Sequence, residues 1–496
     1  MQLKTKILQW SAGVPVAMLN VKTAKKIGVY PLERISIKTL SKHSKEISSI
    51  LDVAKRLVRE NEIAVSSELK KYLNLNNGQR VEVNLATYPQ SINIIKKKAS
   101  NKPLSQNEIN IIIKDIVNDA LSDAEIALFI SATNEHGMTT KETIFFIRAL
   151  QKSGFQLKFK NKIIADKHSI GGIPGNRTTP IVVSICAAAG LTMPKNSSRA
   201  ITSAAGTADV IETIADVEFS VKDLKKIIKK TKACMVWSGS LGVVPADYKI
   251  IKVEKSLKID PEPQLIASIM SKKLAAGSTH ILIDIPYGKN AKVNKKQALD
   301  LKRKFEYYGK YFRKKLVCIL TDGNQPIGNG IGPVLELKDV IKVLNPEERG
   351  NNYPKDLELK SLLLSGKILE LTGKAKKNQG QNMAEQILNS GKAFKKFKEI
   401  IKAQNGSLRK IKDAKFYHNI ISSKTGKIKE INNKKINSLA RVAGCPIDKP
   451  AGIYLYAHVN DKIKKGDKIL TIYAESSMRL KEAIKSYNNL KPITIR

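Results

Sequence analysis

The pattern of hydrophobic and polar positions changes three times along the chain. Residues 1–92 hold short segments in which apolar and polar positions alternate, and this period of two is typical of half-buried strands. The clearest segments span residues 14–19, 35–38, 63–65 and 81–85, and a turn signal at 76–78 precedes the last of them. We therefore expect a β-rich N-terminal domain over residues 1–92.

Helical periodicity replaces this alternation over residues 103–153. Apolar residues recur three and four positions apart, at Ile109, Ile112, Ile113, Ile116 and Val117. Three capping boxes, each a Ser or Thr followed three positions later by Glu, mark helix starts: Ser105 with Glu108, Ser122 with Glu125, and Thr139 with Glu142. The pattern predicts a helical domain over residues 93–158, joined by residues of about 245–276.

Strand and helix patterns alternate from residue 160 onward. Strands are predicted at 163–165, 281–285 and 316–320, and helices at 180–189, after Ser220 and at 263–276. Such alternation favours a mainly parallel α/β domain, here 159–410. The tail returns to strands at 453–459 and 469–473, which predicts a C-terminal α+β domain over 411–496 that resembles small lipoyl-type modules. The predicted fold class is therefore multidomain α/β, with a helical domain, a mainly parallel α/β domain and small β-rich ends.

Composition excludes several classes of protein. The chain has no apolar run of the roughly 18 residues that a membrane span needs, and its first ten residues alternate too much for a signal-peptide core. The cysteines, Cys186, Cys234, Cys318 and Cys445, lie far apart and form no CxxC pair, so we expect them to be reduced core residues. These features predict a cytoplasmic protein without membrane contact.

The chain is strongly basic, with 87 Lys and Arg residues against 44 Asp and Glu residues and a net charge of +43. Nucleic-acid binding is one interpretation of this excess. A general lysine bias on solvated faces is the other, and it is favoured because the lysines are dispersed and aromatic residues make up only 5% of the chain. A basic surface also attracts anionic substrates.

The most informative segment for chemistry spans residues 166–179. Its three glycines permit tight turns that expose backbone N–H groups, and a predicted helix follows directly. Lys167, Ser169 and Thr178 add a charge and two hydroxyl groups, so the segment predicts an anion cradle. It is not a P-loop, since Asn176 and Arg177 stand where that motif requires Gly-Lys. The alternative is an ordinary glycine-rich connection.

A second polar loop spans residues 197–207 and holds five hydroxyl residues and Arg199. Such a loop can bind a second anion or complete the first site, and a helix cap with a turn is the structural alternative. The six histidines are scattered without the spacing of metal ligands, so we expect no metal.

Together with residues 266–273, Ile-Ala-Ser-Ile-Met-Ser-Lys-Lys, the two loops resemble the thymidine and pyrimidine-nucleoside phosphorylases. The resemblance covers roughly residues 95–490, and the N-terminal extension resembles a long branch that holds archaeal AMP phosphorylases and bacterial proteins described as thymidine phosphorylases. It implies a helical and an α/β domain facing each other across a cleft, a homodimer or larger homo-oligomer, and phosphate as co-substrate with no cofactor.

The resemblance also implies roles for individual residues. The phosphate contacts would be Lys167, Ser169, Thr178, Ser197 and Thr207. His168, Lys272 and, in the AMP branch, the proton donor Asp260 would assist the leaving base. The substrate contacts would be Gly172, Ser198, Arg199, Ala200, Ile201, Thr202, Ser203, Ser268 and Lys292.

One base-binding arginine of that family is missing, since Val253 stands near its place with Lys252 beside it. Residues 180–183 and 321–332 resemble the bacterial members more closely, which favours thymidine as substrate, with phosphate giving thymine and 2-deoxyribose 1-phosphate. The alternative substrate is AMP, which would give adenine and ribose 1,5-bisphosphate. A nucleic-acid-binding protein on an inactive phosphorylase fold is the alternative outside enzymes. The presence together of Lys167, Ser169, Ser268 and Lys272 argues against that alternative, so we expect small-molecule partners and no specific nucleic acid.

Overall fold

The computed structural model spans residues 1–496 and describes all of them except 13, 14, 42, 87, 160, 161, 201, 202, 240, 241 and 351, together with the side chain of residue 410. The chain forms two compact units. The first comprises Met1–Ser153 with Pro245–Ser268, and the second comprises Gly154–Val244 with Ile269–Arg496. The predicted division into four domains stays a prediction.

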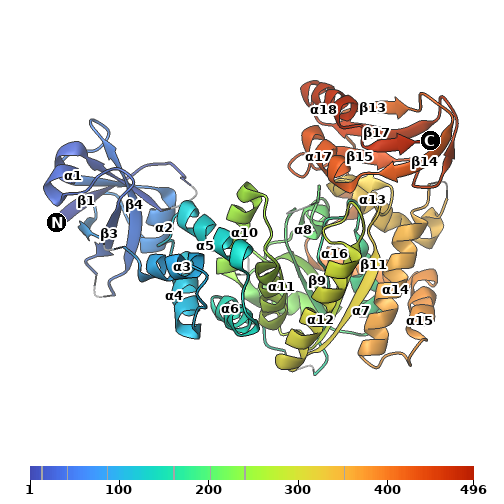
Figure 1. The fold of residues 1–496 in the computed structure, drawn as a ribbon, viewed down its shortest axis with the longest axis horizontal. Coiled ribbons are helices and arrows are strands. Elements are labelled where there is room, and N and C mark those ends of the chain that lie inside the picture. The colour runs from blue at the N-terminus through green and yellow to red at the C-terminus, as the bar shows by residue number, and fades with distance from the viewer. Residues whose placement is uncertain are drawn as a thin grey trace. The chain divides into compact units, whose positions relative to one another are not determined.

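A closed six-stranded β-barrel begins the first unit (Figure 1). Its strands, in the order β1-β5-β2-β4-β3-β6, are β1 (Gln2–Ile7), β2 (Val16–Asn20), β3 (Arg34–Thr39), β4 (Glu46–Ala54), β5 (Glu62–Val65) and β6 (Arg80–Leu85). Two short helices, α1 (Val21–Ile27) and α2 (Ser67–Leu73), accompany them. Closure leaves no strand edge unpaired. The sequence analysis missed β1 and β4 because polar Thr5 and Ser49 occupy buried positions, where they donate to backbone carbonyls.

A bundle of helices completes the first unit. It contains α3 (Gln90–Ala99), α4 (Gln106–Val117), α5 (Asp123–His136), α6 (Thr140–Lys152) and α10 (Pro245–Leu257). All three predicted capping boxes are confirmed at the starts of α4, α5 and α6. Lys249 of α10 donates to the carbonyls of Ile116 and Val117 at the end of α4, so a segment distant in sequence joins the bundle. Helix α11 (Glu262–Ala275) follows and contains the boundary between the units at Ser268.

Parallel strands form the centre of the second unit. They are β7 (Ala165–Ser169), β8 (Met193–Ser197), β9 (Ala233–Trp237), β10 (His280–Tyr287) and β11 (Lys315–Asp322). The order β11-β10-β7 continues into β8-β9 through a single parallel bridge between Ile164 and Thr192. The carboxyl ends of such strands form the usual ligand-binding edge of an α/β sheet.

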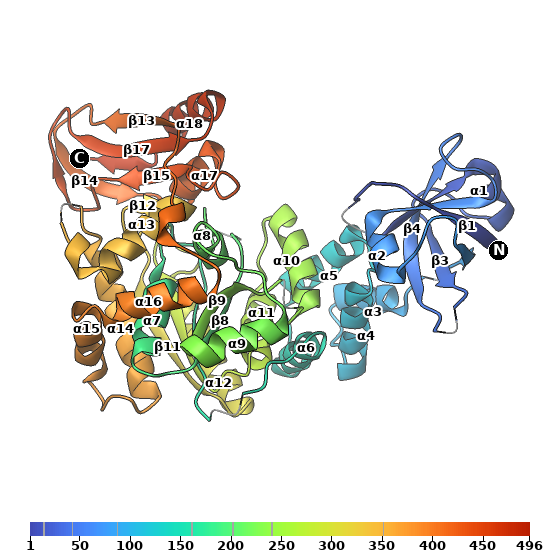
Figure 2. The same ribbon diagram turned by 180° about the vertical axis from the view of Figure 1, so that it is seen from behind.

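Helices surround these strands and complete the predicted α/β architecture. They are α7 (Thr178–Ala188), α8 (Thr207–Ile211), α9 (Val221–Thr231), α12 (Lys295–Tyr311), α13 (Pro333–Leu344), α14 (Lys355–Leu371), α15 (Gly380–Asn389) and α16 (Lys392–Ala403), with 3₁₀ turns at Pro346–Glu348 and Leu408–Lys410. Helix α7 is buried along its whole length and packs against α14, α15 and α16 (Figure 2). The sequence prediction of the fold class is confirmed.

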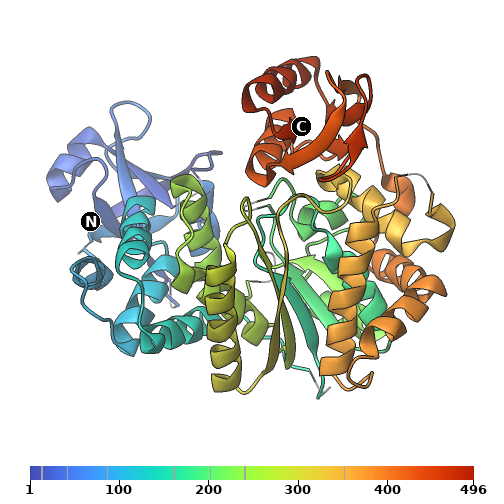
Figure 3. The same ribbon diagram turned by 45° about the vertical axis from the view of Figure 1, so that its right-hand side comes forward.

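The C-terminal part of the second unit is a small α+β structure beside α13 (Figure 3). Its elements are β12 (Gly330–Ile331), β13 (Phe416–Ile421), β14 (Gly426–Ile431), β15 (Gly452–Leu455), β16 (Lys462–Ile463), β17 (Lys468–Ala474), β18 (Ile493–Ile495), α17 (Asn433–Ala443) and α18 (Ser477–Leu490). Because β12 pairs with β15, the chain segment before α13 becomes an edge of the C-terminal sheet.

All four cysteines are free thiols with buried side chains, as predicted. Burial raises the pKa of each of these thiols. Across the described parts of the chain, no helix combines the length and the apolar character that crossing a bilayer requires.

Candidate active site

The predicted anion cradle lies where β7 runs into the loop before α7. The sequence analysis placed the strand at residues 163–165, but β7 extends from Ala165 to Ser169, so Lys167 lies in the strand and not in the loop. This difference arises because buried partners satisfy the polar side chains of this strand. Gly171, Gly172 and Gly175 adopt φ values of 88°, 92° and 68°, as a tight turn requires.

Lys167 is almost completely buried, with 1% of its surface exposed. Its Nζ atom donates to Thr178 Oγ1 over 2.7 Å and to Thr179 Oγ1 over 3.3 Å, at the start of α7. Burial lowers the pKa of Lys167 to about 7, although the carboxylate of Asp284 acts in the opposite direction. Both threonine oxygens accept from the lysine, so their own protons are available to a ligand. The structure thus brings two predicted phosphate contacts together, and a bound dianion would restore the charge of Lys167.

Asp284, which the sequence analysis missed, is the buried counter-charge behind Lys167. Its carboxylate accepts from Thr321 Oγ1 over 2.6 Å and lies 3.1 Å from Lys360 Nζ. These charged partners hold the pKa of Asp284 below its usual value despite desolvation. Asp284 therefore remains ionised and stabilises the cations around it.

The second loop, between β8 and α8, is fixed at both ends by Asp209. Asp209 Oδ2 accepts from the backbone N–H of Ala200 over 2.7 Å and of Gly206 over 2.8 Å. Ser197 Oγ, at the start of this loop, is buried and has no hydrogen-bond partner among the described residues, and Ser203 Oγ donates to Ala205 O. The predicted contacts Ile201 and Thr202 lie outside the described residues.

Arg199 of this loop is held by carboxylates. Its NH1 and NH2 groups donate to the two oxygens of Glu212 over 2.6 and 2.7 Å, and NH2 also contacts Glu218. The guanidinium lies 4.7 Å from the ring centre of Trp237. This pairing lowers the pKa of Glu212 to about 2. A substrate contact by Arg199 stays a prediction, and it would compete with a bidentate pair.

Two side chains that the sequence analysis did not select join the loops. Arg177 donates to Thr207 Oγ1 and Ala205 O, while Asn437 of α17 donates to Gly172 O over 3.4 Å and accepts from Ala204 N over 2.9 Å. Their partners lie up to 265 positions away in the chain, so no local motif could identify the contacts. Through Asn437, the C-terminal domain helps to shape the site.

His168 lies beside a cluster of buried charges. Lys273 Nζ is 2.9 Å and Lys195 Nζ is 3.7 Å from the carboxylate of Asp166, so two lysines share one carboxylate. Desolvation, reinforced by nearby lysines including Lys273 and Lys195, lowers the pKa of His168 well below its usual value. The imidazole is therefore neutral at physiological pH, and a neutral imidazole can both donate and accept a hydrogen bond.

The remaining predicted residues are distributed over both units. Gly172 and Lys292 are neighbours, because a Cβ atom at Gly172 would lie 3.2 Å from Lys292 Cβ. Ser268 and Lys272 are half-buried on α11 with helical spacing, and Asp260 is exposed just before this helix. Ser268 and Asp260 belong to the first unit, and Lys272 belongs to the second.

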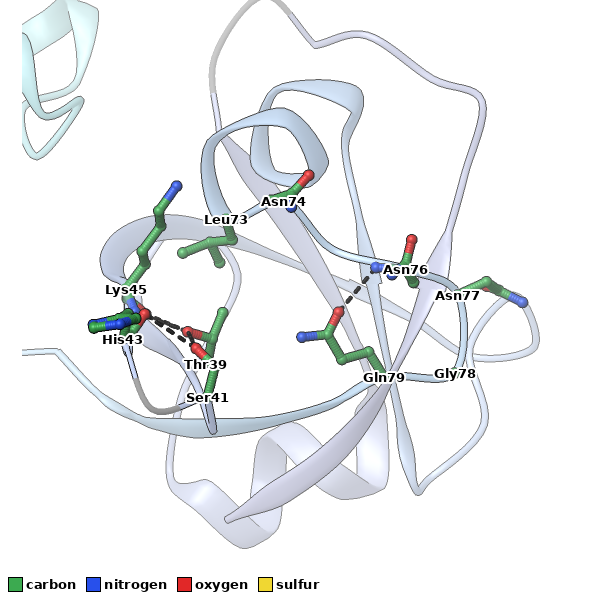
Figure 4. A pocket seen from close by; sticks show the side chains of 10 residues that line it. All are labelled: Thr39, Ser41, His43, Lys45, Leu73, Asn74, Asn76, Asn77, Gly78 and Gln79. Atoms are coloured by element: carbon green, nitrogen blue, oxygen red, sulfur yellow. Dashed lines mark hydrogen bonds between the residues drawn. The ribbon is translucent and has the colours of Figure 1, made fainter.

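A pocket also lies at one end of the barrel, between the β3–β4 loop and the α2–β6 loop (Figure 4). Thr39 Oγ1 accepts from Lys45 N, and Gln79 Oε1 accepts from Asn76 N, so lining residues bond one another. None of the predicted site residues lines it, so its chemistry is separate from that of the cradle.

Three family models match the chain. They are a glycosyl transferase family helical bundle domain over residues 92–154, a glycosyl transferase family α/β domain over residues 161–394, and a pyrimidine nucleoside phosphorylase C-terminal domain over residues 427–494. A relative named AMP phosphorylase, from Methanococcus vannielii, is 38% identical over 99% of this chain and 97% of its own length. The chain belongs to the pyrimidine nucleoside phosphorylase family.

Other relatives of this family carry different functional names. An AMP phosphorylase from Thermococcus kodakarensis is 40% identical over 100% of this chain and 98% of its own. A Legionella pneumophila protein with the provisional name thymidine phosphorylase is 46% identical over 67% of this chain and 63% of its own. Anthranilate phosphoribosyltransferase from Thermus thermophilus shares the fold, with a TM-score of 0.52, 16% identity and coverage of 63% of this chain and 99% of that one.

The family assignment confirms the resemblance stated from the sequence. Val253 is buried in α10, and Lys252 pairs with Asp123 over 3.3 Å. Neither side chain therefore provides the guanidinium that the resemblance led us to expect near this position. The individual roles of the site residues stay predictions.

Proposed function

We propose that the chain catalyses phosphorolysis of a nucleoside monophosphate, converting AMP and phosphate to adenine and ribose 1,5-bisphosphate. The observation that carries this proposal is the similarity, over 99–100% of the chain, to relatives named AMP phosphorylase. That similarity includes the N-terminal barrel. The proposal reverses the preference for thymidine that was drawn from the sequence of residues 180–183 and 321–332.

The geometry supports a site for two anions. Lys167, Thr178 and Thr179 form one set of donors at the start of α7. Ser198 and Arg199 of the second loop would supply the other set. An AMP phosphorylase must bind the 5′-phosphate and inorganic phosphate at the same time. Two sets of donors at the carboxyl ends of neighbouring strands suit this requirement.

The reaction transfers the sugar from the base to phosphate. A phosphate oxygen forms a bond to C1′ while the bond from C1′ to the base nitrogen breaks, and the leaving base takes up one proton. Fixed donors around Lys167 hold the phosphate in line with C1′. In this proposal Asp260 supplies the proton, Ser268 and Lys272 bind the base, and neutral His168 contributes a hydrogen bond.

Phosphorolysis of a pyrimidine nucleoside is the second candidate. The Legionella relative favours it, but that similarity covers only 67% of this chain. The absence of the expected base-binding arginine argues against it, since Val253 can form no hydrogen bond to a pyrimidine.

The test measures phosphate-dependent base release from AMP, adenosine, thymidine and uridine under identical conditions. We expect release of adenine from AMP. We expect the value of kcat/KM for AMP to exceed that for adenosine by at least about tenfold, because a charged group that forms new charge-assisted hydrogen bonds contributes at least that much. Comparison of AMP with adenosine isolates the contribution of the 5′-phosphate.

Lys167→Ala is the control for chemistry at the cradle, and it should abolish most of the turnover. Efficient cleavage of thymidine without cleavage of AMP would reject the proposal in favour of the second candidate. Equal turnover of AMP and adenosine would reject the second anion site.

A further inference from the structure

Arg177 occupies the point where the cradle meets α7. It is the N-cap residue of this helix, and only 7% of its surface is exposed. Sequence analysis considered it only as a departure from the P-loop motif. An arginine this deeply buried requires partners for its charge and for its donors.

The guanidinium contacts two segments of the second unit, α13 and the second loop, through three hydrogen bonds. Its Nε donates to Glu336 Oε2 of α13 over 2.7 Å, NH1 donates to Thr207 Oγ1 over 2.8 Å, and NH2 donates to Ala205 O over 2.7 Å. Glu336 is buried and also accepts from Gly332 N, which fixes the far side of this contact. Arg177 therefore connects the first loop directly to the second.

The contact with Thr207 determines the direction of its hydroxyl proton. A threonine oxygen that accepts a hydrogen bond still has one proton to donate. Within the described part of the chain, that proton has no protein acceptor. A nearby positive charge also makes the hydroxyl a stronger donor. Thr207 is thus prepared to donate to an acceptor that the protein itself does not provide.

From these contacts we propose that Arg177 is a positioning residue that orients the Thr207 hydroxyl toward bound inorganic phosphate. The proposal rests on the proposed phosphorolysis. Lysine could keep the charge beside Glu336 but could not hold three partners in the planar arrangement of a guanidinium.

Binding of inorganic phosphate and of sulfate, measured by titration calorimetry on the full chain, tests this role without requiring turnover. Arg177→Lys should weaken binding of both anions by about tenfold or more, because Thr207 loses a charged partner. Thr207→Val, which keeps the side-chain shape, should weaken binding to a similar extent. Thr207→Ser should bind as the wild type does. The double variant Arg177→Lys with Thr207→Val should bind no more weakly than Thr207→Val alone.

Arg303→Lys is the matched control, since Arg303 is exposed on α12 and pairs with the neighbouring Asp300, and it should leave anion binding unchanged. Anion binding by Thr207→Val equal to the wild type would overturn the proposal. A loss of affinity in the double variant equal to the product of the two single losses would overturn it as well, because the two residues would then act on anion binding independently. A wild type that binds phosphate tightly but releases no base would instead reject the proposed phosphorolysis.

Discussion

At the scale of single residues, the site depends on cations that are buried before any ligand binds. Lys167 and Arg177 are both enclosed, and both use their donors on threonine oxygens. This arrangement converts each cation into a source of oriented hydroxyl donors. The cost of burial is visible in Lys167, whose pKa falls to about 7.

Anion binding should consequently depend on pH through Lys167. As pH rises above about 7, the unliganded amine loses its proton, so binding of a dianion must restore it. Sulfate keeps a double negative charge across this range and is the suitable probe. Its dissociation constant should be constant below about pH 7 and should rise by up to about tenfold per pH unit above it, as calorimetry can measure.

Lys167→Met provides the control, because it should bind sulfate weakly and with no such slope. The same shift affects folding in the opposite sense. The unfolded lysine keeps its proton up to its ordinary pKa of 10.5, so the contribution of Lys167 to stability should increase from about pH 7 to that value. A sulfate affinity that is independent of pH in the wild type would contradict this assignment.

The sequence identified those residues that a local motif brings into contact. Lys167 and Thr178 lie eleven positions apart and meet as the glycine-rich segment predicts. Arg177 and Asn437 could not be identified in this way, because Arg177 contacts α13 and the second loop, and Asn437 of α17 contacts both loops. Residues that meet across distant segments form no motif of fixed spacing, so a single sequence does not reveal their contact.

At the scale of elements, the second loop is held in a compact shape by contacts between its own two ends. Asp209 binds backbone N–H groups at Ala200 and Gly206. The loop also folds back so closely that a Cβ atom at Gly206 would lie 2.5 Å from the carbonyl oxygen of Ser198. The shape of the loop therefore depends on one carboxylate and one glycine.

Removal of that carboxylate should destabilise the loop. Asp209→Ala leaves two buried N–H groups without acceptors, and each costs about 1–3 kcal/mol. We expect a lower thermal transition temperature and at least about a tenfold loss of phosphate-dependent base release, because the loop contributes Ser197 and Thr207. Differential scanning calorimetry and the base-release assay measure these two effects.

Asp209→Asn separates hydrogen bonding from charge. The amide keeps an oxygen that can accept from both N–H groups but loses the ion pairs with Arg199 and Lys449, which are 3.8 and 3.7 Å long. It should remain closer to the wild type than Asp209→Ala does. If the alanine variant were as stable and as active as the wild type, the loop would not need this anchor.

Predictability also differed among the elements. The helix starts at Ser105, Ser122 and Thr139 were predictable because a capping box is a local arrangement with its own hydrogen bonds. Strand β7 was misplaced because its polar residues are satisfied by tertiary contacts. Propensity and pattern therefore predict elements whose stability is local, and they fail where distant partners decide.

At the scale of the whole molecule, the positive charge has two parts. A few cations, such as Lys167, Lys195 and Lys273, are buried around the proposed site. Most of the 87 basic residues are dispersed along the chain. Dispersed charge without a platform of aromatic residues gives electrostatic attraction but no means of distinguishing bases.

Binding to duplex DNA should therefore be weak and unspecific. We expect dissociation constants of roughly 10⁻⁴–10⁻⁶ M at physiological salt, with a steep loss as salt increases. Fluorescence anisotropy with two unrelated duplexes over a salt series measures both properties. Tight binding that distinguishes the two sequences would revive the alternative of a nucleic-acid-binding protein.

The choice of substrate shows where a single sequence was insufficient. The sequences of two short segments favoured thymidine, whereas similarity over the full chain supports AMP. The motifs of the two loops indicate the class of reaction. The identity of the substrate depends on a few contacts to the base. The arginine expected near Val253 is absent, and the motifs alone do not show which base is bound instead.

The burial of all four cysteines has a practical consequence for experiments on this protein. Thiols react as thiolates, so enclosed groups with raised pKa values are poor targets for maleimide dyes. A cysteine introduced at an exposed position, such as Tyr417, would be labelled selectively without removal of the native ones. Pairs of such labels would allow distances within the full chain to be measured by fluorescence energy transfer.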